Sequence, residues 1–357
     1  MIAQINRTRT TPLLYRRGFY LALGGFVALL YGFLWVKQLD KPAGWKPPTA
    51  WSAPEVDASA LTLNAEKLLE TLRRDQGLAR LVNLWGLVAL LLLAGGLILS
   101  VQALARGTVW RVLRTRESHL PGAWSLGDVG RLLVLVVLVA SLLPFVQMGI
   151  MVWTGAAGPW ASSHLWSLVS MFLLEGWVML LVWGFARAKS SSWSSMLGFS
   201  RGGSLRAMEQ AMLGYLACFP WLMGLLWAIV ALCERWHIQP PLEPIHELLF
   251  LERSPLVLSL TVVLACVVGP VVEEIFFRGV VFTALRTRTS RLVAMVISGS
   301  AFAAAHTNAV GFLPILLLGC LLAACYERSG SLWAPIAVHV FHNSLLIGMA
   351  LTLKALL

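Results

Sequence analysis

The chain has 357 residues, of which 58% are hydrophobic and only 13% are charged, and its formal net charge is +11. A water-soluble domain of this length cannot bury so much apolar surface, so the composition indicates that lipid is the solvent for much of the chain. The positive charge does not indicate nucleic-acid binding, because the Lys and Arg residues fall in short loops between apolar runs rather than along a basic stripe. We therefore expect a protein that contacts the lipid bilayer and no nucleic acid.

Nine apolar runs approach or exceed the length of about 20 residues that a helix needs to cross a bilayer. Each run is continuously apolar, whereas the strands of a membrane barrel alternate in polarity over about ten residues. The predicted fold is therefore an all-α, polytopic transmembrane helix bundle of about eight or nine spans. The predicted spans are residues 17–36, 81–105, 131–153, 164–186, 207–233, 255–285, 292–308, 311–326 and 331–353.

The loop charges predict how the bundle is oriented. Arginines and lysines precede the first span and follow the second, fourth and sixth spans, whereas the loops of the other parity are nearly neutral or acidic. The positive-inside rule then places the N-terminus in the cytoplasm and the C-terminus outside, and an odd number of spans agrees. The first apolar run lacks a small-residue cleavage site, so we interpret it as a retained anchor. With no eukaryotic targeting signal, we expect an integral protein of a bacterial inner membrane.

The chain divides into two predicted regions. Residues 1–206 form an N-terminal membrane region of about four spans, and residues 207–357 form a core that carries the polar motifs described below. The longest polar stretch, residues 37–80, begins with several prolines and becomes helix-friendly from residue 58. We place it outside the cytoplasm, either as a substrate-facing element or as a tether.

The sixth span carries an unusual concentration of charge. A charge at the centre of a spanning helix costs about 2.5–3.5 kcal/mol on insertion scales, so Glu273, Glu274 and Arg278 are expected to be paired or functional. Glu274 and Arg278 are four residues apart, lie about 40° apart around the helix and can pair, whereas Glu273 points about 100° away from Glu274. This spacing predicts one tethered and one freer carboxylate. Pro270 should loosen the helix just before them.

The two polar motifs that follow lie on later apolar helices. Phe302 and His306 are four residues apart, so the ring can pack beside the imidazole. His339 and Asn343 share a face by the same spacing, while His342 lies about 60° from His339. Three apolar helices that carry polar groups can converge on one buried pocket, among the C-terminal helices.

Such a pocket has the ingredients for hydrolysing a peptide bond. A carboxylate beside a neutral His can deprotonate a water held between them. His and Asn side chains directed at the developing oxyanion can stabilise the tetrahedral intermediate. The sequence contains neither a Gly-x-Ser-x-Gly elbow nor a His-Glu-x-x-His zinc helix that would indicate another hydrolase.

In this order and on successive membrane helices, the three motifs at residues 273–278, 302–306 and 339–343 resemble those of the CAAX protease and bacteriocin-processing (CPBP) family. The run Gly330 to Ile336 is also similar to the family's approach to its third motif. The resemblance covers roughly residues 255 to 345. It implies a glutamic-type intramembrane endopeptidase that cleaves a membrane-associated protein or peptide precursor, with the core at 207–357 as its protease region.

The resemblance also implies roles for individual residues. Glu273 corresponds to the base that activates water, and His306 to its partner. His339 and Asn343 correspond to the groups that stabilise the oxyanion. The resemblance gives no substrate for this chain, and in particular no prenyl-cysteine substrate.

Glu274 and Arg278 correspond to residues that support the site. No cofactor is expected. The alternative is a zinc site on Glu273, His306 and His339, because one Glu and two His side chains on three helices also form a reasonable ligand set.

Two other classes of function remain open. Buried Glu, Arg and His side chains also serve proton relays, so a transporter or ion-coupled carrier is an alternative, although no internal repeat is visible. A catalytically silent immunity or scaffold protein with the same fold is the second alternative. Glu175, alone in the fourth span, has no assigned role, and for His342 we expect packing or a local hydrogen bond.

Overall fold

A computed structural model describes residues 17–39, 65–107, 120, 124–154, 163–189, 192–199, 204–237, 244–306, 308 and 310–356. These residues form helices and connecting turns without strands, so the predicted all-α fold is confirmed for the described chain. In the N-terminal half the helices are α1 (Arg17–Leu39), α2 (Ala65–Arg74), α3 (Gln76–Ala105), α5 (Leu126–Thr154), α6 (Ser163–Ala188) and α7 (Trp193–Met196).

The C-terminal half begins with α8 (Ser204–Arg235) and α9 (Pro244–Leu251). A long broken helix follows as α10 (Pro255–Val263), η4 (Leu264–Val268), α11 (Gly269–Glu274), η5 (Ile275–Phe282) and α12 (Thr283–Arg286). The last helices are α13 (Arg291–Ala305), α14 (Phe312–Ser329) and α15 (Trp333–Leu356). Each of the nine predicted spans therefore lies on a helix or, for the sixth span, on the broken helix.

Seven of the described helices are long and apolar enough to cross a membrane, and α13 and the described part of α1 are shorter apolar helices. The chain is an integral membrane protein. Of the predicted extracytoplasmic segment 37–80, residues 40–64 lie outside the described residues, and the segment's last residues already belong to α3. The boundary predicted between residues 206 and 207 stays a prediction, because α8 packs against α3 on one side and against α14 and α15 on the other.

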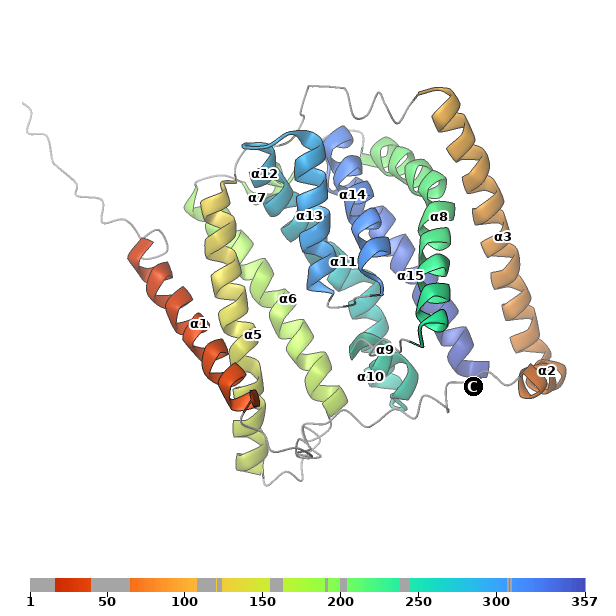
Figure 1. Ribbon diagram of the computed structural model, residues 1–357, viewed down its shortest axis with the longest axis horizontal. Helices are drawn as coiled ribbons and strands as arrows, with labels where there is room; N and C mark the ends of the chain where they lie inside the picture. The colour runs from red at the N-terminus through yellow and green to blue at the C-terminus, as the bar shows by residue number, and fades with distance from the viewer. Residues whose placement is uncertain are drawn as a thin grey trace, which may run out of the picture.

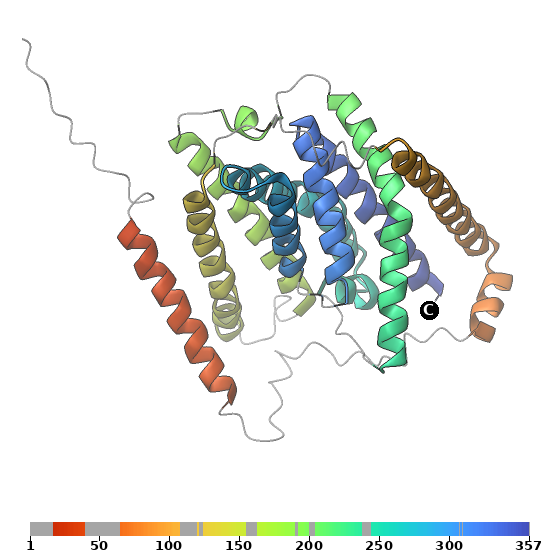
Figure 2. The same ribbon diagram turned by 45° about the horizontal axis from the view of Figure 1, so that its top comes forward.

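The long helices lie side by side in both views of the bundle and run in alternating directions (Figure 1, Figure 2). The start of α1 and the end of α15 lie at opposite ends of the bundle, as an odd number of spans requires (Figure 1). In the apolar stretch of α3 only 11% of the residues are buried, whereas in α14 the share is 39%. We infer that α14 is a central helix and that α3 lies at the periphery, with its apolar side chains facing lipid.

Two glycines allow α13 and α14 to pack closely next to the polar residues. A Cβ atom on Gly319 would lie 2.8 Å from the Cα of Gly299, so no larger side chain fits at this crossing. Small residues permit such close backbone contact between membrane helices. This contact sets the distance from α14 to the end of α13, where His306 lies.

The broken helix departs from regular α-helical geometry on both sides of Glu273 and Glu274. The segments η4 and η5 are π-helical, and Pro270 lies at the start of α11 between them. A proline removes a backbone donor, and π-helical turns are frequent at functional sites. The loosened helix predicted around Pro270 is present, and both carboxylates lie in the short α-helical segment between the two π-helical ones.

Candidate active site

The six residues predicted to form a site come from three neighbouring parts of the bundle. The broken helix carries Glu273, Glu274 and Arg278, the end of α13 carries His306, and α15 carries His339 and Asn343. The broken helix packs against both α13 and α15, which brings the three motifs together. The predicted convergence on one region among the C-terminal helices is therefore present.

Glu274 and Arg278 form a fully buried ion pair. The side chains of both are 0% exposed, and Arg278 Nη1 donates a hydrogen bond to Glu274 Oε1 at 2.7 Å. Arg278 Nη2 also donates to the carbonyl of Gly319 at 3.2 Å, and the guanidinium lies 4.3 Å from the centroid of the Phe302 ring. The pairing that the helical spacing predicted is confirmed, and Arg278 additionally connects the broken helix to α13 and α14.

His339 lies between the two carboxylates. Its Nδ1 atom is 2.8 Å from Glu274 Oε1, and its Nε2 atom is 3.7 Å from Glu273 Oε2. The short contact makes Nδ1 the nitrogen that donates to Glu274, so Nε2 is the nitrogen that faces Glu273. The longer separation exceeds a direct hydrogen bond but is one that a water can bridge.

Glu273 differs from Glu274 in exposure and in contacts. The Glu273 side chain is 28% exposed, and its Oε2 atom is buried without a hydrogen-bond partner among the described residues. A carboxylate oxygen with unused lone pairs, next to a histidine nitrogen, can accept a proton from a water molecule. The predicted division into one tethered and one freer carboxylate agrees with these contacts.

His306 ends α13, and its ring is held in place by the helix that carries it. The Nδ1 atom lies 2.9 Å from the carbonyl oxygen of Phe302 and donates to it, which leaves Nε2 as the other, acceptor nitrogen. The rings of Phe302 and His306 pack with centroids 4.7 Å apart, and the Phe302 ring also packs against His339 at 5.5 Å. Within the described residues His306 makes no hydrogen bond to Glu273. The two side chains would therefore interact through a water molecule or the substrate.

Asn343 makes a contact that the sequence did not indicate. Its Nδ2 atom donates a hydrogen bond to the carbonyl of Ala265 in the π-helical segment η4, at 2.8 Å. A π-helical turn leaves backbone carbonyls without their usual partners, so this bond stabilises the break in the helix. The amide group carries a second N–H that this bond leaves available.

Two polar residues outside the three motifs lie close to the site. His342 is buried and its Nδ1 atom lies 3.0 Å from the hydroxyl of Tyr215 on α8. Its hydrogen bond therefore joins two helices, whereas we expected packing or a local hydrogen bond. Glu175 on α6 is half-buried and near enough to Glu273 for their charges to interact. In the described part of the chain it has no hydrogen bond or ion pair. Sequence analysis missed Tyr215, and its only signal there was a polar hydroxyl in an apolar span.

The zinc alternative would use Glu273, His306 and His339 as ligands. Among the described residues no group of three or more His, Cys, Asp and Glu side chains is placed to hold a metal ion. His339 directs Nδ1 at Glu274, and His306 directs Nδ1 at a backbone carbonyl. Both contacts leave Nε2 for another partner, as in histidines that ligate a metal, so zinc binding stays a prediction.

Comparison with known proteins finds a family match over part of the chain. Residues 255–345 match the family described as "Type II CAAX prenyl endopeptidase Rce1-like". The matched segment contains all three motifs, from Glu273 to Asn343. The resemblance to the CAAX endopeptidases is therefore confirmed for this segment, which is about a quarter of the chain.

Two curated relatives overlap the chain only in part. The chain is 33% identical over 92 residues, 26% of its length, to a Bacillus subtilis protein named "Putative membrane peptidase YdiL". It is 28% identical over 129 residues, 34% of its length, to an "Uncharacterized 24.3 kDa protein" of Escherichia coli. These alignments span 38% and 59% of the two relatives. No solved structure matches the chain significantly.

Proposed function

We propose that this protein is an intramembrane endopeptidase that hydrolyses a peptide bond in a membrane-associated protein or peptide precursor. The observation that carries the proposal is the difference between the two adjacent carboxylates. Glu274 is fully buried and its Oε1 atom contacts Arg278 and His339, whereas Glu273 is 28% exposed and its Oε2 atom lies 3.7 Å from His339 without a hydrogen bond among the described residues. The family match of residues 255–345 supports the same class of reaction.

In the proposed reaction Glu273 removes a proton from a water molecule, and the water oxygen attacks the carbonyl carbon of the scissile bond. The tetrahedral intermediate carries its negative charge on the former carbonyl oxygen. The free N–H of Asn343 donates to that oxygen, and His339 donates to it through Nε2 when its ring carries a proton on both nitrogens. His306 orients the water or substrate through its Nε2 atom. The C–N bond then breaks, and the leaving amine takes the proton that Glu273 removed.

Glu274 and Arg278 position these groups rather than react. The carboxylate of Glu274 accepts from His339 Nδ1, which holds the ring with Nε2 toward Glu273. Arg278 neutralises the Glu274 charge in a region that water does not reach. We propose a reaction without a metal, because no group of three or more His, Cys, Asp and Glu side chains among the described residues is placed to hold a metal ion.

The test compares membrane proteins from cells with wild-type enzyme, with Glu273→Gln and with His306→Ala. New N-termini within or next to a membrane segment should appear with the wild type and disappear with both variants, while the variants accumulate to normal levels. Cys233→Ala serves as a control, because this half-buried cysteine lies outside the site. If both variants process every substrate as the wild type does, the proposed function is wrong.

The orientation of the chain is a second part of the proposal. We propose that the N-terminus lies in the cytoplasm of a bacterial inner membrane. The helices α3, α6 and α12 end on the side of the bundle where α1 starts, and Arg106, Arg187 and Arg286 lie at these helix ends. A reporter that is active only in the cytoplasm should work when fused before α1 and fail when fused after α15. The opposite result would reverse the orientation.

A further inference from the structure

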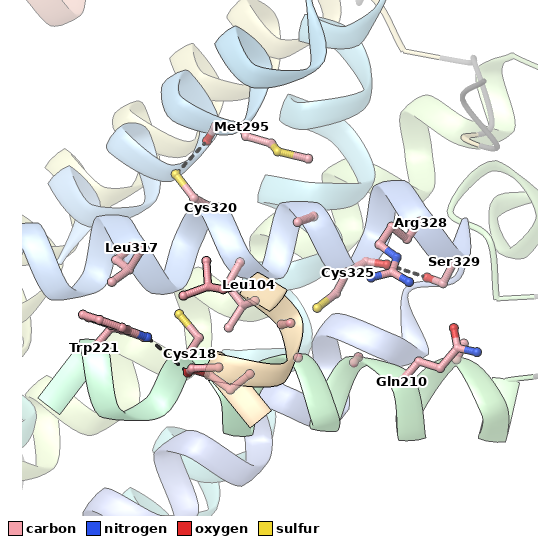
Figure 3. A pocket seen from close by; sticks show the side chains of 18 of the residues that line it. Leu104, Gln210, Cys218, Trp221, Met295, Leu317, Cys320, Cys325, Arg328 and Ser329 are labelled. Atoms are coloured by element: carbon pink, nitrogen blue, oxygen red, sulfur yellow. Dashed lines mark hydrogen bonds between the residues drawn. The ribbon is translucent and has the colours of Figure 1, made fainter. Parts of the chain in front are cut away.

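A cavity of about 650 Å³ lies between α3, α8, α13 and α14, apart from the candidate active site. Figure 3 shows side chains from these helices directed into it, among them Leu104, Cys218 and Leu317. No residue of the catalytic cluster lines the cavity. The carbonyl of Gly319 on α14 accepts from Arg278, and the next residue, Cys320, lines the cavity.

The wall of the cavity is almost entirely apolar, and the cavity is open toward the side of the bundle. Leu104 on α3 and Trp221 on α8 line it and are each 56% exposed, so they form a rim where lipid surrounds the helices. Three of the five cysteines, Cys218, Cys320 and Cys325, also line the cavity. Such a surface inside a membrane attracts hydrocarbon rather than water or a polar substrate.

One end of the cavity is polar and positively charged. Gln210 on α8 and Arg328 and Ser329 on α14 line this end (Figure 3). Arg328 is exposed and forms no ion pair with the described residues, whereas its neighbour Glu327 is buried and paired with Arg286 and Arg291. The guanidinium is therefore available to an anion from outside the chain, such as a phosphate group.

The length of the cavity corresponds to one leaflet of a bilayer. On α8 the polar end at Gln210 and the apolar end at Trp221 are 11 positions apart, and Leu317 and Arg328 on α14 are separated by the same number. At 1.5 Å per residue this is about 16 Å along each helix. The hydrocarbon core of a bilayer is about 30 Å thick, so one leaflet contributes about half of that.

We propose that this cavity binds one acyl chain of an anionic phospholipid, with the phosphate at Arg328 and the chain directed toward Trp221. The cavity can accommodate the acyl chain because of its volume, its apolar wall, its lateral opening and its length. Arg328, which has no ion pair among the described residues, can pair with the negative charge of the headgroup. The lipid comes from the leaflet next to the basic loops, where such headgroups meet juxtamembrane arginines. The proposal is independent of the proposed peptidase function, because no residue of the catalytic cluster lines the cavity.

Two glycines on α8 allow a matched test. A Cβ on Gly214, which lines the cavity, or on Gly224, which does not, would meet no atom within 4 Å, so a side chain can start from either position without an immediate clash. The full-length protein and its variants Gly214→Leu, Gly224→Leu and Arg328→Gln are placed in vesicles. The vesicles contain a trace of phosphatidylglycerol or phosphatidylcholine with a photoreactive group on one acyl chain. Crosslinked peptides are then identified by mass spectrometry.

We expect phosphatidylglycerol to label α8 and α14 peptides of the wild type about fivefold more than phosphatidylcholine, the preference that one arginine near a membrane surface provides. Gly214→Leu should lose this labelling and Gly224→Leu should retain it. Arg328→Gln should be labelled equally by both lipids, because only the headgroup contact is removed. Equal labelling of the two leucine variants would show that the cavity does not hold the chain, and equal labelling of the wild type by both lipids would refute the role of Arg328.

Discussion

Removing the cation that pairs with Glu274 and neutralising Glu273 should change the free energy of unfolding by different amounts, and the structure gives the magnitudes. Arg278→Met leaves Glu274 fully buried with no cation, and breaking a buried ion pair by removing one partner costs about 3–5 kcal/mol. Glu273→Gln changes a side chain that is 28% exposed and has an oxygen without a hydrogen bond, so it should cost less than about 1 kcal/mol. The first variant should therefore lose stability and activity, and the second should lose activity alone.

The assay is thermal unfolding of the purified proteins in detergent, together with cleavage of a substrate identified from the membrane proteome. At roughly 2–4 °C per kcal/mol, Arg278→Met should unfold on the order of 10 °C below the wild type. Glu273→Gln should unfold within about 4 °C of it. Both variants should be inactive, for different reasons.

A double variant separates charge from packing. Glu274→Leu together with Arg278→Met removes both buried charges, and replacing a buried ion pair with apolar residues is often neutral for stability. Most of the lost stability should return, while activity stays absent because His339 has lost the partner of its Nδ1 atom. The reasoning fails if Arg278→Met unfolds at the wild-type temperature, or if Glu273→Gln is as unstable as Arg278→Met.

Three further predictions concern the metal, the pH dependence and the helix packing. Cleavage should persist after treatment with a strong chelator; loss of activity that zinc restores would contradict the metal-free mechanism. Burial raises the pKa of the Glu252 carboxyl, but hydrogen bonds from two backbone amides and from His164 outweigh it, and the pKa falls below its ordinary value. The ionised carboxylate therefore stabilises the fold at neutral pH, so Glu252→Gln should lower the melting temperature at pH 7. The difference in melting temperature from the wild type should vanish as the pH falls below about 4. A constant difference across this range would contradict the role of the charge. Gly299→Leu should lower the free energy of unfolding by about 1–3 kcal/mol and reduce cleavage, because its side chain would push α13 away from Gly319. The control Gly224→Leu should change neither. Equal melting temperatures for the two variants would contradict this packing.

Interactions within one helix were predictable from the sequence. The helical period places Glu274 and Arg278 on one face and turns Glu273 away from them, and the structure has the predicted ion pair. The nine apolar runs likewise predicted helices at the right places, because the length and continuity of a run depend only on local composition. Pro270 predicted an irregular helix for an equally local reason, the missing backbone donor.

Contacts between helices were not predictable in the same way. The rotation and depth of one helix against another depend on close packing, such as the contact of Gly299 with Gly319, and no spacing within a single helix records them. The sequence could not show that His339 directs Nδ1 at Glu274, or that Asn343 donates to a backbone carbonyl in η4. The contact of His342 with a hydroxyl on α8 belongs to the same class.

The sequence by itself therefore determined that the chain is a helical membrane protein, which polar residues are candidates for the chemistry and how the two glutamates differ in pairing, because burial in lipid and the helical period are local properties. The tertiary structure decided which atoms of those residues meet. It placed His339 between the two carboxylates and left a cavity between α8 and α14. These features arise where side chains from separate helices pack together, and packing depends on the whole bundle rather than on any one segment.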